Sequence, residues 1–536
     1  MPGEDDPSKP RSAPGGEEPR PDLAEVLERQ ALTRDEARPD QVERRHAAGG
    51  RTARENIADL VDPGSFVEYG ALAIAAQRAR RDLQELLERT PADGLIAGIG
   101  RVNGDLFGPE SSACAVLSYD YMVLAGTQGA IGHKKKDRLF ELIERMRLPA
   151  VFFAEGGGGR PGDTDYAVVS ALETRAFALW ARLSGQAPRI AIVAGKCFAG
   201  NAVIAGSADL IVATENASLG MGGPAMIEGG GLGKVDPDDV GPAATQAQNG
   251  VIDVAVADEV EAVAAAKRLL SYFQGDTAPG EAPDQLSLRD LVPERRRRAY
   301  DVRPAIETLA DARSVIFLRE KFAPGMVTAL ARIEGRPTGV VANNPMHLAG
   351  AITSDGADKA ARFMQLCDAF GLPLVSLIDT PGMMVGPDAE ATALVRHCSR
   401  LFVAGAALRV PLVAVILRKA YGLGAQAMAG GSLHEPLLTV GWPTAELGPM
   451  GLEGAVRLGF RRELEQIADA DEREQRVQEL TEIAHERAKA LNAATLFELD
   501  DVIDPAESRR LIAATLGAAA ASVDRPVGER RFVDPW

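Results

Sequence analysis

The chain has 536 residues, 46% of them hydrophobic and 25% charged, so it is long enough for two or more domains with sizeable cores. Its formal charge of −17 disfavours nucleic acid and anionic membrane surfaces as partners. Aromatic residues make up only 5% of the chain, which argues against stacking platforms for single strands. The four cysteines have no C-x-x-C spacing, so we expect neither a zinc ribbon nor a redox pair, and no bound metal.

The chain opens with a polar extension. Residues 1–48 are rich in Pro, Gly and mixed charge, and we expect them to be disordered, although 22–47 could form a solvated helix. No segment resembles a signal peptide, and no apolar run approaches the roughly 18 residues of a membrane span. We therefore expect a cytoplasmic protein.

Globular sequence begins near residue 49 and alternates short apolar runs with helical patterns. The runs at 150–154 and 190–194 are rich in β-branched residues and are predicted to be strands buried on both faces. A helix is predicted over 137–146. A second composition break at 275–300 contains four arginines at 295–298 and is interpreted as a solvated linker.

Beyond that break the same pattern returns, with strands predicted at 374–378 and 412–416 and a helix over 358–370. Four segments match in order and at nearly constant separation: Arg101 with Arg332, Pro149 with Pro373, Pro188 with Pro411, and Leu219 with Leu447. This indicates a tandem duplication of one α/β domain of about 200 residues. We predict domains at 49–290 and 291–536.

Each copy has a small-residue turn after its second buried strand, FAGNA at 198–202 and YGLGA at 421–425. Such a turn can simply allow tight packing. It can also expose the unpaired N–H groups of a helix start, which stabilise a developing oxyanion. Two equivalent turns favour two sites for two carbonyl ligands.

At this point the residues resemble a known family. Residues 339–386 contain Asn-x-Pro, Asp-x-x-x-Lys-Ala-Ala-Arg-Phe and Asp-x-Pro-Gly, and segments 90–104, 418–425 and 442–456 agree as well. Together they resemble the carboxyltransferase (β) subunits of biotin-dependent acyl-CoA carboxylases, the propionyl-, acetyl- and methylcrotonyl-CoA group. The resemblance implies two crotonase-like ββα-spiral domains and a hexameric ring, with each active site between domains of different subunits.

The resemblance also implies the reaction and its site. CO2 would pass from carboxybiotin to the α-carbon of an acyl-CoA, with no side-chain nucleophile. Backbone N–H groups of Gly200 and Asn201 would hold the thioester oxygen, and those of Leu423 and Gly424 the ureido oxygen of biotin. The implied acyl-CoA contacts are Lys134, Gly157, Gly158, Gly159, Arg160, Ala199, Ala425 and Gln426. The implied biotin contacts are Pro381, Gly382, Tyr421 and Gly422.

Several positions depart from the family pattern. Ala425 and Gln426 stand where many members have an aromatic residue and Asp, which leaves the acyl group open and suggests a roomier pocket. Asn201 replaces a usual Gly and could crowd the thioester. The loop from Glu155 to Arg160 could shape the acyl pocket or form a turn. The run 133–136 could begin a solvated helix or hold CoA phosphates; Asp379 and Glu446 are interpreted as structural.

Three alternatives stay open: a biotin-dependent decarboxylase or transcarboxylase, a catalytically weak structural subunit of a mixed ring, and a biotin-free hydratase. The hydratase is disfavoured because such enzymes are single-domain and use side-chain acids. The chain has neither an ATP-grasp pattern nor a Met-Lys-Met biotin acceptor. We therefore expect biotin to be carried by a partner, an α subunit containing the biotin carboxylase and carrier, in a homo- or hetero-hexamer.

Overall fold

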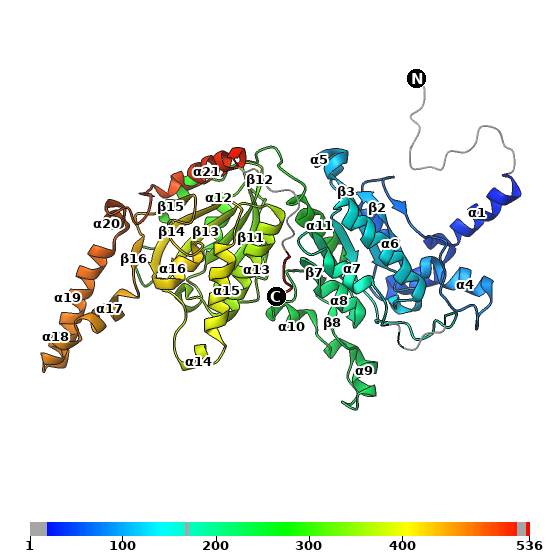
Figure 1. Ribbon diagram of the computed structural model, residues 1–536, viewed down its shortest axis with the longest axis horizontal. Helices are drawn as coiled ribbons and strands as arrows, with labels where there is room; N and C mark the ends of the chain where they lie inside the picture. The colour runs from blue at the N-terminus through cyan, green and yellow to red at the C-terminus, as the bar shows by residue number, and fades with distance from the viewer. Residues whose placement is uncertain (1–18, 167–169, 171, 523–531) are drawn as a thin grey trace, which may run out of the picture. The chain divides into compact units, whose positions relative to one another are not determined.

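The computed structural model describes residues 19–166, 170, 172–522 and 532–536, and it contains two compact units (Figure 1). The first ends at Gln274 and the second begins at Gly275, upstream of the boundary expected at 290. The reason is local: Thr277 N donates to Gly335 O over 3.0 Å, and Leu288 is buried in the core of the second unit. The composition break therefore belongs to the second unit.

The first unit is built on a seven-stranded sheet in the order β1-β2-β3-β4-β5-β7-β9. The first three strands are antiparallel and the rest add in parallel. A separate parallel pair, β6 with β8, follows the sheet. The strands are β1 (Val67–Glu68), β2 (Leu95–Arg101), β3 (Ala113–Tyr119), β4 (Ala150–Phe153), β5 (Arg189–Val193), β6 (Lys196–Phe198), β7 (Leu210–Thr214), β8 (Ser218–Gly220) and β9 (Val254–Val256).

Helices cover both faces of this sheet. Four of them, α6, α7, α8 and α10, contribute to one buried cluster, and α11 contacts β5, β7 and β9. The helices of this unit are α1 (Pro21–Ala31), α2 (Pro39–Ala47), α3 (Ala53–Leu60), α4 (Leu83–Arg89), α5 (Gly104–Ser111), α6 (Ala130–Met146), α7 (Ala176–Arg182), α8 (Gly200–Gly206), α9 (Pro224–Gly229), α10 (Ala243–Gln248) and α11 (Glu259–Ser271).

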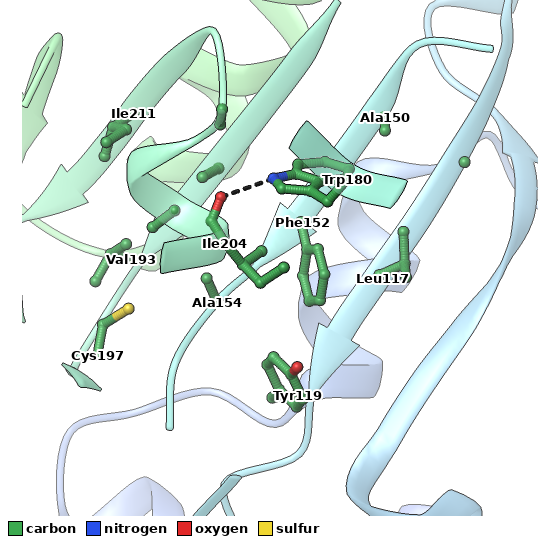
Figure 2. Close-up of a cluster of buried hydrophobic side chains, with 14 of the residues drawn as sticks. Leu117, Tyr119, Ala150, Phe152, Ala154, Trp180, Val193, Cys197, Ile204 and Ile211 are labelled. Carbon is green, nitrogen blue, oxygen red and sulfur yellow. Dashed lines mark hydrogen bonds between the residues drawn. The ribbon is translucent and has the colours of Figure 1, made fainter. Parts of the chain in front are cut away.

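The core between this sheet and its helices is aromatic at its centre. Phe152 on β4 packs against Tyr119 on β3, with ring centroids 5.3 Å apart, and edge-on against Trp180 on α7. Figure 2 shows Trp180 Nε1 donating to Ile204 O on α8, over 2.8 Å. This bond ties α7 to the short helix that follows the first small-residue turn.

The second unit repeats the plan with an eight-stranded sheet in the order β10-β11-β12-β13-β14-β15-β17, and β16 pairs with β14. Here one long strand, β14, pairs with β15 through its first half and with β16 through its last three residues. The strands are β10 (Ile316–Leu318), β11 (Met326–Ile333), β12 (Arg336–Asn343), β13 (Leu374–Thr380), β14 (Leu412–Tyr421), β15 (Leu438–Gly441), β16 (Glu446–Gly448) and β17 (Asp501–Val502).

Helices α13, α15 and α16 pack together on the side of β11–β14, and α13 and α15 lie side by side in Figure 1. Residues of α12 and α21 complete the cluster on the other face. The helices of this unit are α12 (Arg303–Leu309), α13 (Ser354–Phe370), α14 (Pro387–Glu390), α15 (Leu394–Ala406), α16 (Gly422–Met428), α17 (Leu452–Gly459), α18 (Arg461–Gln466), α19 (Ala470–Ala488), α20 (Ala490–Thr495) and α21 (Ser508–Ser522).

The duplication predicted from the sequence is confirmed element by element. Both α6 and α13 have 17 residues, and both α8 and α16 have seven. The sixth residue of each long helix is a buried lysine whose Nζ donates to two backbone carbonyls, Lys135 to Ala92 and Leu95, and Lys359 to Arg319 and Phe322. The two copies therefore share their local chemistry as well as their topology.

Part of the N-terminal extension is anchored to the first unit. Arg38 is buried and its Nη1 lies 2.8 Å from Asp120 Oδ2. Arg45 on α2 pairs with Glu155 at 2.7 Å. The extension was expected to be disordered, with a solvated helix possible over 22–47; the structure has two helices in that range, α1 and α2, neither with a buried residue. Residues 1–18 lie outside the described part of the chain. No helix in the described ranges is long and apolar enough to cross a membrane.

Candidate active site

The first small-residue turn joins β6 to α8 through a strained residue. Ala199 has φ 51° and ψ −121°, a conformation that L-residues rarely adopt. The N–H groups of Gly200 and Asn201, which follow it, find no acceptor among the described residues. They lie at a helix start, so they are available donors for a carbonyl oxygen.

A glycine loop at 156–159 lies against this turn. A Cβ on Gly158, which has φ +90°, would stand 2.8 Å from the Cβ of Ala199, so the turn requires a glycine there. Gly157 and Gly159 are exposed and Gly158 is buried. The structure thus places four of the predicted acyl-CoA contacts, Ala199 and these three glycines, in one neighbourhood.

The side chain of Asn201 is fully buried, so it does not occupy the open side of the turn. Its Oδ1 accepts from Gly158 N over 3.0 Å, and its Nδ2 donates to the carbonyls of Gly126 and Glu155 over 3.3 Å each. The sequence suggested that this side chain could crowd the thioester. The structure shows it inside the protein, where it does not crowd the open side of the turn. Asn201 instead holds the glycine loop.

The basic run at the start of α6 divides into different environments. Lys134 is exposed, and its Nζ lies 3.1 Å from Tyr166 Oη and 4.6 Å from the centroid of that ring. Lys135 and Lys136 are buried, so neither a solvated helix start nor a phosphate-binding role describes them. Burial lowers the pKa of Lys135 to about 8 and that of Lys136 to about 7, because the charged amine loses its water.

Arg160, expected to contact the acyl-CoA, is engaged by protein groups. It forms a buried ion pair with Asp93, and it donates to Thr127 O over 2.9 Å and to Thr127 Oγ1 over 3.2 Å. Burial raises the pKa of Asp93, and the Arg160 guanidinium acts in the opposite direction. The arginine therefore fixes the end of the glycine loop, with its guanidinium directed to the protein.

The second small-residue turn, between β14 and α16, repeats the first. Gly422 occupies the place of Ala199 with φ +57°, and the N–H groups of Leu423 and Gly424 find no acceptor among the described residues. A Cβ on Gly424 would stand 2.7 Å from the Cα of Gly382, so the Pro381–Gly382 backbone closes directly over this turn. Gly382 N donates to Thr380 Oγ1 over 3.1 Å, which holds that loop from within.

The residues in and just after this turn differ in their exposure to solvent. Leu423 and Gln426 are exposed, whereas Gly424 and Ala425 are buried. Tyr421 is buried and its hydroxyl donates to Glu446 Oε2 over 2.9 Å. Burial and the neighbouring carboxylate raise the pKa of Tyr421, so its hydroxyl stays protonated.

Two buried carboxylates support the second turn, in keeping with the structural role expected for both. Asp379 is fully buried and pairs with Arg418, Nε to Oδ2, over 3.0 Å. Glu446 lies 3.0 Å from His485 Nδ1 and 3.2 Å from Arg296 Nε. Each carboxylate oxygen is occupied by cationic or hydroxyl donors, so neither is a free general base.

A cavity of about 960 Å³ borders the second turn within the second unit. It is enclosed by the segment 292–297, the end of β14, and helices α17 and α19, and Tyr421 and Lys419 line it. The arginine run at 295–298 was interpreted from composition as a solvated linker, but three of its residues line this cavity. The backbone carbonyls of Arg296 and Arg298 also accept hydrogen bonds from Arg418 Nη1. The run is therefore partly structural.

Sequence reasoning missed Gln128 and Lys136, which contact the first site. Gln128 Nε2 donates to Asn201 Oδ1 over 3.0 Å, and Lys136 Nζ donates to Gln128 Oε1 over 2.6 Å. Lys136 ends a run of three lysines, residues 134–136, and such a run is ordinarily interpreted as solvated. The helical period places Lys136 three residues before Leu139 and four before Phe140, both buried, and that spacing is the signal that could have found it.

Comparison with known proteins identifies the family. The carboxyl transferase domain model matches residues 44–531. This chain belongs to the carboxyl transferase family. It is a carboxyltransferase of the kind found in biotin-dependent acyl-CoA carboxylases and transcarboxylases, with the duplicated crotonase-like architecture expected from its sequence.

The relatives include both types of enzyme. The methylmalonyl-CoA carboxyltransferase 12S subunit of Propionibacterium freudenreichii subsp. shermanii is 34% identical, over 89% of this chain and 90% of its own length. The propionyl-CoA carboxylase β chain of Saccharopolyspora erythraea is 32% identical, over 89% of this chain and 88% of its own.

Among solved structures, a single-chain, multi-domain long-chain acyl-CoA carboxylase is 56% identical with a TM-score of 0.89. That likeness covers 93% of this chain, which spans 49% of the carboxylase. A hexameric transcarboxylase 12S structure with methylmalonyl-CoA bound is 30% identical with a TM-score of 0.81, covering 95% of this chain and 98% of its own.

Proposed function

We propose that the chain carboxylates an acyl-CoA at its α-carbon, taking the carboxyl group from biotin carried on a partner protein. The observation that carries this proposal is the pair of equivalent turns. Each offers two adjacent backbone N–H groups without an acceptor among the described residues, at Gly200 and Asn201 and at Leu423 and Gly424. One turn suits a thioester oxygen and the other suits a ureido oxygen.

The residues of the second turn fit a neutral ureido group. Its donors are backbone N–H groups, and the acids beside it, Asp379 and Glu446, are already paired with basic side chains. Biotin, when bound, supplies the carboxyl group that is transferred. The chain's own contribution is to hold two carbonyl oxygens with donors whose positions are fixed before the reaction begins.

In the first unit the same logic applies to the thioester. Removal of the α-proton places negative charge on the thioester oxygen, which the N–H groups of Gly200 and Asn201 would stabilise. Such donors each contribute about 3 kcal/mol to lowering a barrier. The closely packed loop at 156–159 would line the acyl side of this hole, and Lys134, exposed at the start of α6, is proposed to attract CoA phosphates.

The acyl group is proposed to be a long chain. Identity with the long-chain acyl-CoA carboxylase is 56%, against 34% with the methylmalonyl-CoA enzyme and 32% with the propionyl-CoA enzyme. The assembly proposed is a hexamer that closes each active site between the first unit of one subunit and the second unit of another, together with a biotin carboxylase and carrier protein.

The test is biotin-dependent decarboxylation, the reverse direction. The purified chain is incubated with free biotin and carboxyacyl-CoAs of increasing chain length, and loss of the carboxyl group is followed. We expect turnover that requires biotin and rises with chain length. Preference for malonyl-CoA would refute the long-chain assignment, whereas turnover with a keto acid as acceptor would favour transcarboxylation. No turnover by a folded hexamer would instead indicate an inert structural subunit.

A further inference from the structure

The first unit contains a buried lysine that the proposed reaction does not use. Lys136 on α6 is completely inaccessible to solvent, and no carboxylate in the described ranges forms an ion pair with it. Its Nζ donates to Tyr119 Oη over 2.9 Å and to Gln128 Oε1 over 2.6 Å. Burying an amine with two neutral partners destabilises the fold, so its presence calls for a compensating role.

The hydrogen bonds of this lysine determine the orientation of two amides. Lys136 Nζ donates to the Gln128 oxygen, so the Gln128 nitrogen faces Asn201 and donates to its Oδ1. Asn201 Oδ1 then accepts, and its nitrogen is turned toward the carbonyls of Gly126 and Glu155. The two amides thus connect Lys136 to the backbone carbonyls of Gly126 and Glu155.

The glycine loop is the last member of this series of hydrogen bonds. Asn201 Oδ1 accepts the N–H of Gly158, and Asn201 Nδ2 donates to Glu155 O at the start of the same loop. The loop residues 156–159 have no side chains of their own with which to hold a position. Backbone bonds also hold the loop, among them Gly156 N to Lys196 O over 2.6 Å and Gln128 N to Gly158 O over 2.7 Å. Asn201 adds two side-chain bonds from the helix whose N–H groups form the first hole.

The second unit lacks this relay. The seventh residue of α13, which corresponds to Lys136, is Ala360, and Gly424 stands in the place of Asn201. The sixth residue is lysine in both helices and donates to two backbone carbonyls in each. The relay is therefore an addition to one copy of the duplicated fold.

We propose that Lys136 is a positioning residue for the acyl-CoA half of the site. It acts through Gln128 and Asn201 to hold the loop 156–159 against the donors of the first turn. This inference rests on the proposed function for its catalytic consequence. Lys136, the two amides and the loop all lie in the first unit. Removing the lysine should therefore change the acyl half and leave the biotin half intact.

The test is a double-mutant cycle between Lys136→Met and Asn201→Gly, because glycine keeps the backbone donor and removes only the relay. We expect Lys136→Met to lower kcat/KM for the carboxyacyl-CoA about tenfold with KM for biotin unchanged. In the Asn201→Gly background the same substitution should change kcat/KM less than twofold. Effects that multiply independently, or an equal change in the KM for biotin, would overturn the proposal.

A second readout needs neither substrate nor turnover. Hydrogen–deuterium exchange of the peptide covering residues 155–160 should accelerate about tenfold in Lys136→Met and no further in the double variant. Gln128→Glu, which keeps the acceptor for Lys136 and loses the donor to Asn201, should accelerate the same peptide if Lys136→Met does not fold. An unchanged exchange rate in both variants would refute the relay. An inactive wild type with the expected exchange pattern would refute the proposed function alone.

Discussion

Substituting Gly424 by alanine tests whether the second turn requires the close approach seen in the structure. The added Cβ would stand 2.7 Å from Gly382 Cα and 2.8 Å from Gly382 C. Non-bonded carbon atoms prefer about 3.5–4.0 Å, so the two segments must separate by about 1 Å. The Leu423 and Gly424 N–H groups would then shift relative to the oxygen that they are proposed to hold.

The expected loss follows from that displacement. A misplacement of about 1 Å in a reacting geometry lowers rates about 100-fold, and overpacking destabilises a fold by about 1–3 kcal/mol. We predict that Gly424→Ala lowers kcat for biotin-dependent decarboxylation about 100-fold while the protein remains folded. The assay is initial-rate kinetics at saturating biotin and carboxyacyl-CoA, accompanied by thermal unfolding.

Gly206→Ala is the matched control. Gly206 ends α8, is exposed, and has nothing within 4 Å of an added Cβ. Alanine should stabilise that helix end by up to about 1 kcal/mol and leave the rate unchanged. If Gly424→Ala retains activity within twofold of the wild type, the tight second turn does not position the reaction, and the reasoning fails.

Three further substitutions have expected outcomes. The pKa of Lys136 is about 7 in the fold and about 10.4 unfolded, so between these values only the unfolded chain holds the proton. Lys136 should therefore contribute a rise of about 1.4 kcal/mol per pH unit to the free energy of unfolding from pH 7 toward 10. Lys135, whose pKa is lowered to about 8, adds a rise of its own, so Lys136→Met should reduce the slope measured in denaturant titrations by about 1.4 kcal/mol per pH unit; equal slopes in the variant and the wild type would contradict this. Asp209→Asn breaks a fully buried ion pair with Arg189, 2.9 Å apart, and should lower the free energy of unfolding by about 3 kcal/mol. A decrease of less than about 1 kcal/mol in urea titrations would refute this prediction. Tyr421→Phe should lower it by only about 1 kcal/mol, because Glu446 retains its basic partners; a loss of biotin affinity would instead show that the hydroxyl binds biotin.

The sequence predicted the parts of the fold that depend on repetition and periodicity. The strands at 150–154, 190–194, 374–378 and 412–416 correspond to β4, β5, β13 and β14, because short β-branched runs between Pro and Gly are typical of buried parallel strands. The duplication was visible because equivalent residues keep equivalent positions in two copies. The unit boundary was less predictable, since a polar, Pro-rich segment can still pack when a single residue such as Leu288 is buried.

The site likewise has parts that the sequence predicted and parts that it did not. Glycines in the two turns could be identified from the sequence because backbone approach leaves a residue-type signature. The partners of polar side chains could not. Arg160 pairs with Asp93, and Arg45 with Glu155, across long sequence separations that no local pattern encodes. The burial of Lys136, like that of Lys135, was not evident from the lysine run, because a charged residue is ordinarily exposed.

The most direct test of the central claim is forward transfer of a labelled carboxyl group. The purified chain is mixed with a biotin carrier protein carrying a ¹⁴C-carboxyl group and with a long-chain acyl-CoA. The proposed function predicts label in the acyl-CoA product, at a rate that depends on the chain and is about 100-fold lower for Gly424→Ala. Label that remains on the carrier, or is released only as CO2 while the chain is folded, would contradict it.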